Sequence, residues 1–546
     1  MPWPRNDADH RLVRTDAMVG IEDRLFASGL PVEALMEKAA LAVSRRLLEQ
    51  HDTWLRRHGA LVLVGPGHNG GDGLVVAREL HLAGIPTRLW SPFERHRPLT
   101  DAHLRHALWL GLPKLEQPPE ADDPALWIDA LLGIGQRRPP GTAIESLLAA
   151  RQQHRPHQLV AVDVPTGLCS DSGQLTGTTA ATARCTYCIG LIKQGLLQDA
   201  ALAWVGELER LDLGLPSSLL AGLPDPGTRI LWPSDRATAP WPALPPAAGK
   251  YGRGRLLLLA GSHRYPGAAA LAVAGASASG CGSLRAALPM ELARGLWQQA
   301  PHVLLDPPLP VTADGSSGLG GLATSIDGRL DALLVGPGLG PDAGPASPDD
   351  GDAAAWDWLQ RFTGLLVLDA DGLNRLATRD GALWMNNRQG PTWITPHGHE
   401  FQRLFPDLSD DLPLEAASAA AERCQAAVLL KGARSVVADP EGRRWQLGQA
   451  EARSARTGLG DVLAGYAAGC GARALAALGG PEGHRTHPAL ASLGPSLAPW
   501  LAAAALDHAW AGIKACRRLG QGVTPMEVAR DLVDGEIRTQ QNVAMF

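Results

Sequence analysis

The sequence has few features of a secreted or membrane-bound protein. Its seven cysteines are an odd number scattered over 546 residues, which does not suit a disulfide framework. The first residues carry charge but not the apolar core of a signal peptide, and the longest uncharged stretches are rich in Gly, Ala, Ser or Pro rather than in large apolar residues. We therefore expect a cytoplasmic protein with no membrane partner.

Basic residues are also outnumbered by acidic ones. Lys and Arg number 50 against 56 Asp and Glu, so the formal net charge is -6 and nucleic acid is not an expected partner. Only six of the basic residues are lysines, and Lys193, Lys250 and Lys431 lie beside glycine-rich segments. Because an ammonium is compact and titratable where a guanidinium is not, these lysines are candidates for chemistry.

One pair of cysteines has the spacing of a metal motif. Cys185 and Cys188 form a CxxC, but a tetrahedral zinc site needs two further ligands, and no second CxxC or HxxxH accompanies it. The favoured interpretation is a pair of buried thiols.

Apolar runs of strand length recur along the chain, with helical segments between them. Because they are continuously apolar rather than alternating, they predict strands buried on both faces, as in the parallel sheets of α/β proteins. A segment with seven prolines, 223–249, separates two groups of runs. We expect an amino-terminal domain over 1–225, a linker over 226–248 and a carboxy-terminal domain over 249–546. The runs are 60–65, 126–133, 158–165, 255–261, 331–338, 365–371, 392–395 and 427–432.

Three strand ends in the first half carry polar loops. The first, GPGHNGGDG over 65–73, contains a GxGxxG pattern, but Asp72 puts a carboxylate where a pyrophosphate would need only amides. Parallel sheets bring such loops together in one crevice, where Asn69, Asp129 and Thr166 would offer oxygen ligands to a hard cation. Lys193, in a glycine-flanked turn, could exchange protons with a buried Asp.

These segments resemble the NAD(P)H-hydrate epimerases, whose motifs include MEKA, NGGDG, DALxGxG, DxPSGL and KxGLL. The resemblance spans about residues 10–215 and implies a Rossmann-like three-layer sandwich with potassium held by Asn69, Asp129 and Thr166. A carboxylate and an ammonium at one crevice suit ring epimerisation by proton transfer, so Asp163 and Lys193 are the predicted catalytic residues. The positions it implies for binding the hydrated cofactor, besides Asp163, are His68, Asn69, Gly70, Gly71, Asp72, Gly133 and Gly135.

In the second half, the sequence TGLGDVLAG over 457–465 has small residues immediately before a predicted helix. The amides of residues 458–461 would bind an anion with help from the helix dipole, and Asp461 could accept a hydroxyl proton during phosphoryl transfer. An Asp that simply caps the helix is the alternative. The sequence KGARS, with Lys431 and Ser435, adds an ammonium and a hydroxyl to the same phosphate region.

These motifs, with GPGLG, DADxLN and TPHxxE, resemble the ribokinase-like NAD(P)H-hydrate dehydratases over about residues 248–540. The resemblance implies that Asp461 and His397 both contact the hydrated cofactor, and that Asp461 is the base. The segment 451–460 departs from the family, because arginines replace an Asn-rich approach to Asp461. The nucleotide contacts it implies are Lys431, Gly432, Ser435 and Gly460, and its other cofactor-binding positions are Ala268, Gly338 and Gly340.

The two halves in this order resemble the bifunctional NAD(P)H-hydrate repair enzymes. That family epimerises the R and S forms of NADHX and NADPHX and dehydrates the S form at the expense of ADP or ATP. Potassium and Mg²⁺ are the implied cofactors, and we expect a homo-oligomer. An Arg-rich, Ala-rich composition that looks bacterial favours ADP.

Three alternatives remain open. An NAD(P)-dependent oxidoreductase would need a ribose-binding acid at the end of the strand after the glycine loop, and IPTRLW (85–90) does not offer one there. A small-molecule kinase of the thiazole or hydroxymethylpyrimidine type would share GxGD but not the first half. The altered 451–460 segment favours a non-catalytic nucleotide-sensing module.

Overall fold

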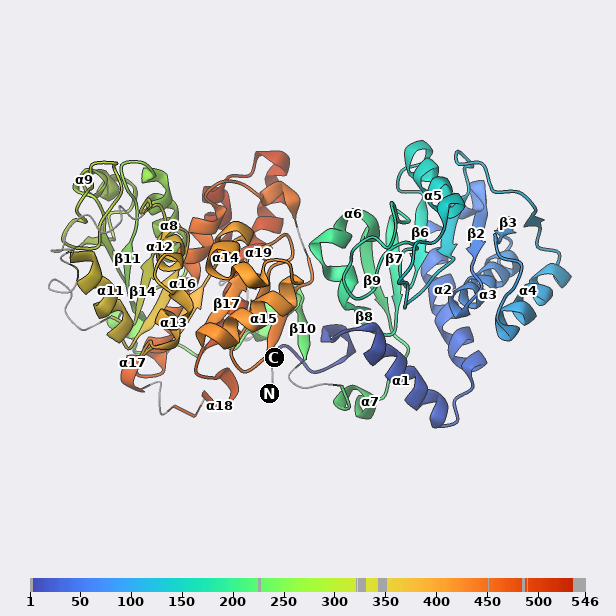
Figure 1. The fold of residues 1–546 in the computed structure, drawn as a ribbon, viewed down its shortest axis with the longest axis horizontal. Coiled ribbons are helices and arrows are strands. Elements are labelled where there is room, and N and C mark those ends of the chain that lie inside the picture. The colour runs from blue at the N-terminus through green and yellow to red at the C-terminus, as the bar shows by residue number, and fades with distance from the viewer. Residues whose placement is uncertain are drawn as a thin grey trace. The chain divides into compact units, whose positions relative to one another are not determined.

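The computed structural model divides the chain into two compact units (Figure 1). One unit is Asn6–Gly227, and the other combines Thr228–Phe546 with Met1–Arg5. The described residues are 3–223, 227–320, 322, 330–341, 351–449, 451–483, 487–488 and 490–533.

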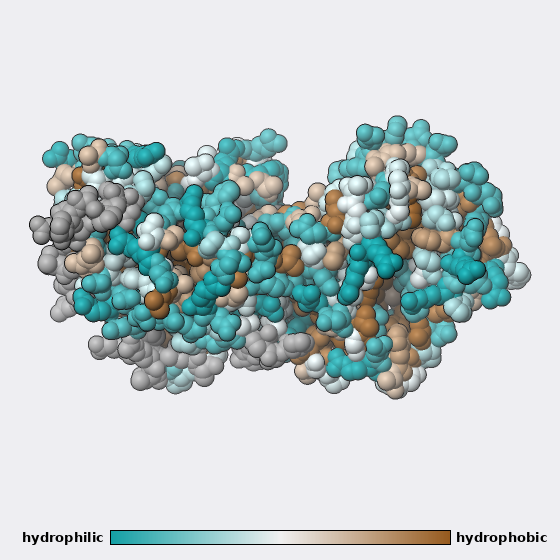
Figure 2. Space-filling view, viewed as in Figure 1, coloured by the Kyte–Doolittle hydropathy of each residue, from teal (hydrophilic) through white to brown (hydrophobic). Residues whose placement is uncertain are grey.

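The face of the molecule drawn in Figure 2 is largely polar. On the face shown in Figure 2, hydrophilic residues cover most of each unit, and hydrophobic residues form smaller areas between them. Among the helices in the described ranges, none is both long and apolar enough to span a bilayer.

The Asn6–Gly227 unit is built on a seven-stranded sheet in which every pairing is parallel. The strand order is β4-β3-β2-β5-β6-β7-β9, so β2 and β5 lie at the centre. The predicted runs at 60–65, 126–133 and 158–165 are confirmed as strands. The strands are β2 (Ala60–Val64), β3 (Thr87–Trp90), β4 (Lys114–Leu115), β5 (Leu126–Ala130), β6 (Leu159–Val162), β7 (Cys185–Ile189) and β9 (Glu207–Leu211).

Helices cover both faces of this sheet. Alternate residues of β2 pack on opposite sides: Val62 and Val64 contact the core beneath α2, α3 and α4, and Leu61 and Leu63 contact the core beneath α5. A three-layer α/β arrangement results, as expected. The helices are α1 (Thr15–Ala27), α2 (Val32–His58), α3 (His68–Leu82), α4 (Pro98–Trp109), α5 (Thr142–His154), α6 (Leu202–Val205) and α7 (Ser217–Ala221).

The second unit contains a ten-stranded sheet of order β10-β19-β18-β17-β16-β15-β14-β11-β12-β13. It is parallel except around β18, which runs antiparallel to both of its neighbours. The five apolar runs predicted here are confirmed as β11, β14, β15, β16 and β17. The strands are β10 (Thr228–Leu231), β11 (Arg255–Leu259), β12 (Ser283–Ala287), β13 (Leu304–Leu305), β14 (Ala332–Val335), β15 (Leu365–Leu368), β16 (Thr392–Ile394), β17 (Ala427–Leu430), β18 (Val436–Ala438) and β19 (Arg444–Leu447).

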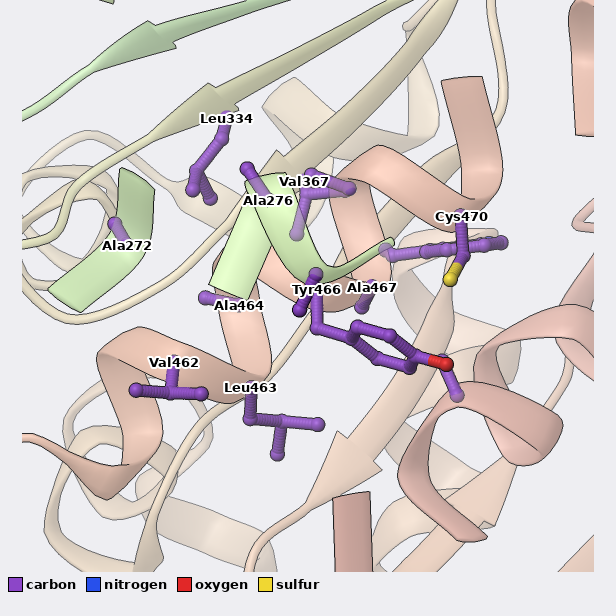
Figure 3. Close-up of a cluster of buried hydrophobic side chains, with 14 of the residues drawn as sticks. Ala272, Ala276, Leu334, Val367, Val462, Leu463, Ala464, Tyr466, Ala467 and Cys470 are labelled. Atoms are coloured by element: carbon purple, nitrogen blue, oxygen red, sulfur yellow. The ribbon is translucent and has the colours of Figure 1, made fainter. Parts of the chain in front are cut away.

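The core of this unit centres on α16 (Leu459–Ala477), which packs against α8 (Pro266–Ala278) and the sheet (Figure 3). Ala272 and Ala276 of α8 lie near Ala464 and Tyr466 of α16, with Leu334 of β14 beside them. The two helices approach closely because glycines face backbone: a Cβ at Gly465 would lie 1.9 Å from the Ala272 carbonyl oxygen. The other helices are α9 (Met290–Gln299), α11 (Gly351–Arg361), α12 (Asp371–Ala377), α13 (Gly381–Asn386), α14 (Gly398–Leu404), α15 (Pro413–Cys424), α17 (Gly480–Gly483), α18 (Leu490–Leu493) and α19 (Ala498–Leu519).

The segment expected as a linker is partly built into this second unit. Strand β10 pairs in parallel with β19, and Ile230 and Leu231 are buried. Four residues between prolines are too short a run to be recognised as a strand from sequence. The chain start joins the same unit, because the Trp3 indole donates a hydrogen bond to the Asp235 carbonyl oxygen at 3.1 Å.

Candidate active sites

A buried ion pair lies at the carboxyl edge of the seven-stranded sheet. Lys193 Nζ donates a hydrogen bond to Asp163 Oδ1, and a second one to the Ile189 carbonyl oxygen at 2.7 Å. Lys193 is only 1% exposed and Asp163 only 8%. Burial alone would lower the pKa of Lys193, but the neighbouring Asp163 carboxylate outweighs it and the pKa is raised. The lysine is therefore a fixed ammonium beside a carboxylate.

The backbone at Asp163 is held in an unusual conformation. Its φ of +68° lies in the left-handed region, which costs a residue with a side chain about 1 to 3 kcal/mol. Asp163 N donates to the Tyr187 carbonyl oxygen at 2.8 Å, and Ile189 N donates to Asp163 Oδ1 at 3.1 Å. These contacts hold the carboxylate at the end of β6, towards Lys193.

The pair opens onto a cavity of about 820 Å³, a volume suited to a dinucleotide-sized ligand. Burial, together with nearby carboxylates, raises the pKa of Glu22 to about 7 and raises the pKa of Asp72 well above its ordinary value. Several predicted site residues line this cavity together, namely His68, Asn69, Asp72, Gly133, Gly135, Asp163 and Lys193.

Gly70 and Gly71 do not line the cavity. Both are buried: a Cβ at Gly70 would lie 2.0 Å from the Gly65 carbonyl oxygen, and one at Gly71 would lie 2.6 Å from Met36 Cε. These two glycines allow the start of α3 to pack tightly against its surroundings. His68, by contrast, is exposed, and its Nε2 lies 3.3 Å from Arg97 Nη1.

Asp129 is a fully buried carboxylate next to the cavity. Its Oδ1 accepts a hydrogen bond from Thr166 Oγ1 at 2.8 Å, and its Oδ2 accepts one from Thr166 N at 2.8 Å. Burial raises the pKa of Asp129 to about 6. Asn69 lies beside the loop after β5, since a Cβ at Gly133 would lie 3.6 Å from Asn69 Oδ1. The structure thus places the Thr166 hydroxyl on the buried Asp129 carboxylate and Asn69 against the loop that follows Asp129.

In the second unit, an ammonium and several acids meet at the ends of β15, β16 and β17. Lys431 Nζ donates to Asp369 Oδ1 at 2.7 Å and lies 3.9 Å from Glu400 Oε2. Thr395 Oγ1 also donates to Asp369 Oδ1, at 2.8 Å. Burial raises the pKa of Glu400 to about 7.

Asp461 joins this cluster from the first turn of α16. Burial, and then the charge of Asp369, raise the pKa of Asp461 to about 7, although Lys431 acts in the opposite direction. Gly458, the N-cap residue, has a φ of +90° and no side chain with which to cap the turn. Gly460 brings the helix start to the ammonium, since a Cβ there would lie 3.3 Å from Lys431 Nζ.

His397 stands at the N-terminus of α14. Its Nε2 lies 3.2 Å from Glu400 Oε1, and the backbone N of His397 donates to Glu400 Oε2 at 2.9 Å. Burial lowers the pKa of His397, which favours the neutral ring. A parallel bridge between His397 and Lys431 places the histidine beside the acid and lysine cluster.

The GPGLG loop after β14 packs against the start of α8. A Cβ at Gly338 would lie 2.6 Å from Ala268 Cβ, and Gly338 has a φ of +64°. Gly340 N donates to Asp371 Oδ2 at 2.8 Å. The structure therefore brings Ala268 and Gly338 together. Through its hydrogen bond to Asp371, Gly340 is held near the cluster that contains Asp369.

A second cavity, of about 340 Å³, adjoins Lys431. It is lined by Gly432, Ser435 and Gly460, with Glu451 and Ser454 from the segment that departs from the family. The two arginines of that segment are not among the lining residues, and each has a protein partner. Arg453 Nη2 lies 2.6 Å from Glu451 Oε2, and Arg456 Nη2 donates to the Gln521 carbonyl oxygen at 2.5 Å.

Some residues at these sites were not singled out from the sequence. Glu22 lies on α1, outside every motif. In the sequence it stands out only as an acidic residue next to the apolar positions Met18, Ile21 and Leu25 of the helix. His508 on α19 lines the smaller cavity, and burial lowers its pKa to about 4. Neither residue has a neighbour in sequence that would point to the site.

The fold and the two sites define an α/β enzyme with one cavity at a buried Asp–Lys pair and another at a helix start. Two family models match: the YjeF-related protein N-terminus over residues 32–195 and NAD(P)H-hydrate dehydratase over residues 256–528.

Relatives match along nearly the full length. A bifunctional NAD(P)H-hydrate repair enzyme of Synechocystis sp. is 38% identical over 540 residues, which cover 97% of this chain and 95% of the relative. One of Gloeobacter violaceus is 41% identical over 451 residues, or 82% and 85% of the two chains. The chain belongs to the family of bifunctional NAD(P)H-hydrate repair enzymes.

A solved structure is also similar. The ADP/ATP-dependent NAD(P)H-hydrate dehydratase of Bacillus subtilis, co-crystallized with ATP/Mg²⁺, matches with 23% identity and a TM-score of 0.42, covering 56% of this chain and 97% of that one.

Proposed function

We propose that the Asn6–Gly227 unit interconverts the R and S epimers of NADHX and NADPHX. The observation that carries this proposal is the buried Lys193–Asp163 pair opening onto a cavity of about 820 Å³. Epimerisation of a hydrated ring needs proton transfer to and from one substrate, without a second bound reactant. Asp163 and Lys193 are the proposed catalytic residues.

We propose that the second unit dehydrates the S epimer with ADP or ATP. Asp461, with its pKa near neutrality, would accept the proton of the ring hydroxyl as that oxygen attacks the terminal phosphoryl group. The first-turn amides of α16 and the Lys431 ammonium would balance the charge on the phosphate. Departure of phosphate from C6 and of a proton from C5 then restores the ring double bond.

The binding roles follow the same division. In the first unit, His68, Asn69, Asp72, Gly133 and Gly135 would contact the hydrated cofactor, while Gly70 and Gly71 would act by packing. In the second, His397, Ala268, Gly338 and Gly340 would contact it. Lys431, Gly432, Ser435 and Gly460 would contact the nucleotide, and the cavity of about 340 Å³ that they line supports this.

A potassium ion fits beside Asp129. A buried carboxylate is costly unless a cation balances it, and Asp129 has no ion-pair partner among the described residues. Asn69, Asp129 and Thr166 would hold the ion, which would supply charge balance and hold the loops after β2, β5 and β6 together. Within the described ranges, His, Cys, Asp and Glu do not form a metal-binding group of three or more. The phosphates of the nucleotide would be the main ligands of Mg²⁺, an ion that usually binds few protein side chains and keeps several waters.

One assay tests the whole proposal. Purified protein is incubated with mixed NADHX epimers, with and without ADP or ATP, and both the epimer ratio and the recovered absorbance of reduced nicotinamide are followed. The proposal expects epimer exchange without nucleotide and recovery of NADH only with it. A small-molecule kinase or an oxidoreductase would give neither result, and a nucleotide sensor would bind nucleotide without recovering NADH.

The same proposal includes a cytoplasmic location, the cell compartment where NADH and NADPH turn over, and a homo-oligomeric state. Light scattering after size-exclusion chromatography measures the oligomeric state directly. Parallel assays with ADP and ATP, and with NADHX and NADPHX, settle the preferences among these substrates.

A further inference from the structure

Helix α1 is attached to the strand that carries Lys193. The short strand β1 (Leu12–Val13), just before α1, pairs in parallel with β8 (Ile192–Lys193), with Val13 opposite Lys193. Thr15 N, at the start of α1, donates to Asp171 Oδ1 at 2.6 Å. These contacts hold α1 beside the ion pair, so Glu22 on that helix lines the same cavity as Lys193.

The Glu22 carboxyl group is available for contact with a ligand. The Lys193 ammonium is already committed to Asp163 and the Ile189 carbonyl oxygen. Across the described part of the chain, the carboxyl groups of Glu22 and Asp72 have no hydrogen bond or ion pair to protein. Two carboxyl groups therefore line the cavity with their hydrogen-bonding capacity unused, next to a carboxylate that is already paired.

Glu22 gains and loses its proton near neutral pH. Burial raises its pKa to about 7, Lys193 acts in the opposite direction, and Asp163 and Asp23 add to the rise. The other charged or titratable side chains lining the cavity are Asp23, His68, Asp72, Arg97, Arg137 and Arg138. Burial lowers the pKa of His68, so His68 titrates below the range in which Glu22 does.

We propose that Glu22 and Asp72 are the acid and base that act on the ring oxygen during epimerisation, exchanging roles between the two directions of the reaction, while Asp163, held by Lys193, stabilises the positive charge that develops on the ring. This deepens the epimerase function proposed above and rests on it. Glu22 would be a catalytic residue, since it faces the cavity that the hydrated ring would occupy.

The chemistry balances without any further reactant. Hydration of the dihydropyridine puts a hydroxyl on C6, next to the ring nitrogen, and the two epimers differ at that carbon. Glu22 gives its proton to the hydroxyl, the C6–O bond breaks, water leaves, and the nitrogen lone pair forms a C=N bond. A water molecule then adds to the opposite face, its extra proton passes to Asp72, and the electron pair returns to nitrogen. The reverse reaction starts from protonated Asp72.

The test compares epimer exchange in wild type, Glu22→Gln and Asp16→Asn, with thermal midpoints measured alongside. Asp16 is the matched control, because it is an exposed acid on the same helix and is not among the residues that line the cavity. Glu22→Gln should slow exchange by about 100-fold or more with an unchanged midpoint, while Asp16→Asn exchanges normally. The reaction needs one of the two carboxyl groups protonated and the other ionised, so the wild-type rate should pass through a maximum with one limb near pH 7, where Glu22 titrates, and Glu22→Gln should lose that limb.

Two results would overturn the proposal. A folded Glu22→Gln protein that exchanges epimers at the wild-type rate removes Glu22 from the reaction. Exchange in ¹⁸O-labelled water that inverts C6 without incorporating the label excludes cleavage of the C6–O bond. If wild type itself does not exchange the epimers, it is the epimerase function that fails, so the two failures are distinguishable.

Discussion

Lys431 Nζ donates a hydrogen bond to Asp369 Oδ1 at 2.7 Å, although the two residues follow different strands, β17 and β15. The contact spans β16, which lies between them in the sheet, and it places an ammonium under the first turn of α16. Asp461 thus stands near one cation and three further acids, Asp369, Asp371 and Glu400, and burial together with these charges sets its proton affinity.

Replacement of Asp461 by Asn should separate chemistry from binding. Asn keeps the shape of the side chain but cannot accept the proton, so dehydration should fall by about 100- to 10,000-fold while nucleotide still binds. Turnover, nucleotide affinity and the thermal midpoint are measured on the same preparation. Asp410→Asn, at an exposed acid, is the control. A loss confined to stability would indicate that Asp461 only caps the helix.

The same site predicts a pH dependence. A base works in its ionised form, and the pKa of Asp461 is raised to about 7, so dehydration should increase as pH rises through about 7. Glu400 titrates in the same range. The rate profile of Glu400→Gln distinguishes the two acids: it should keep this rise if Asp461 is the base, and a flat profile would assign the rise to Glu400.

Lys193→Ala should slow epimer exchange by about 100-fold or more, because Asp163 loses the ammonium that holds it in place. Truncation also leaves a buried carboxylate unpaired, so Lys193→Met, which fills the same volume, is measured in parallel. Lys114→Ala removes a partly exposed lysine from β4 and should exchange normally. Normal exchange by either folded Lys193 variant would contradict the proposed role.

Potassium should stabilise the first unit. An ion that binds only the folded state raises the unfolding midpoint as its concentration increases. The thermal midpoint is followed in KCl, LiCl and choline chloride at equal ionic strength, and only KCl should raise it. Asp129→Asn and Thr166→Val should abolish the dependence, since they remove ligand oxygens. Equal midpoints in all three salts would count against the site.

Gly465→Ala should destabilise the second unit by about 1 to 3 kcal/mol or more, because its Cβ would lie 1.9 Å from the Ala272 carbonyl oxygen and force α16 away from α8. Gly295→Ala, in the middle of α9 with open space around the new methyl group, should stabilise it by about 0.5 to 1 kcal/mol. Chemical denaturation of the two variants measures both changes, and equal effects would refute the close approach.

The central strands were predictable because parallel strands covered on both faces are continuously apolar, as β2 and β11 are. Strand β10 was not, since its four residues stand among prolines and gain their burial from β19, more than 200 residues away in the sequence. Local pattern carries no information about such a partner. The antiparallel strands β18 and β19 were missed for a similar reason, because both are short.

Loops at strand ends were predictable as site elements, since the topology of a parallel sheet brings them together. Asp163 and Asp369 both follow a strand directly, and each is found with a lysine. Glu22 could not be found in this way. It lies on a helix, and contacts between distant parts of the chain, such as the pairing of β1 with β8, place it near Lys193.

The attachment of Trp3 has a consequence for dividing the protein. The chain passes between the two units twice, between Arg5 and Asn6 and between Gly227 and Thr228, so one cut cannot release both units whole. A fragment starting at Thr228 would lack the indole that bonds to Asp235 and packs on the core. Supplying the first five residues as a separate peptide should restore part of any stability that such a fragment loses.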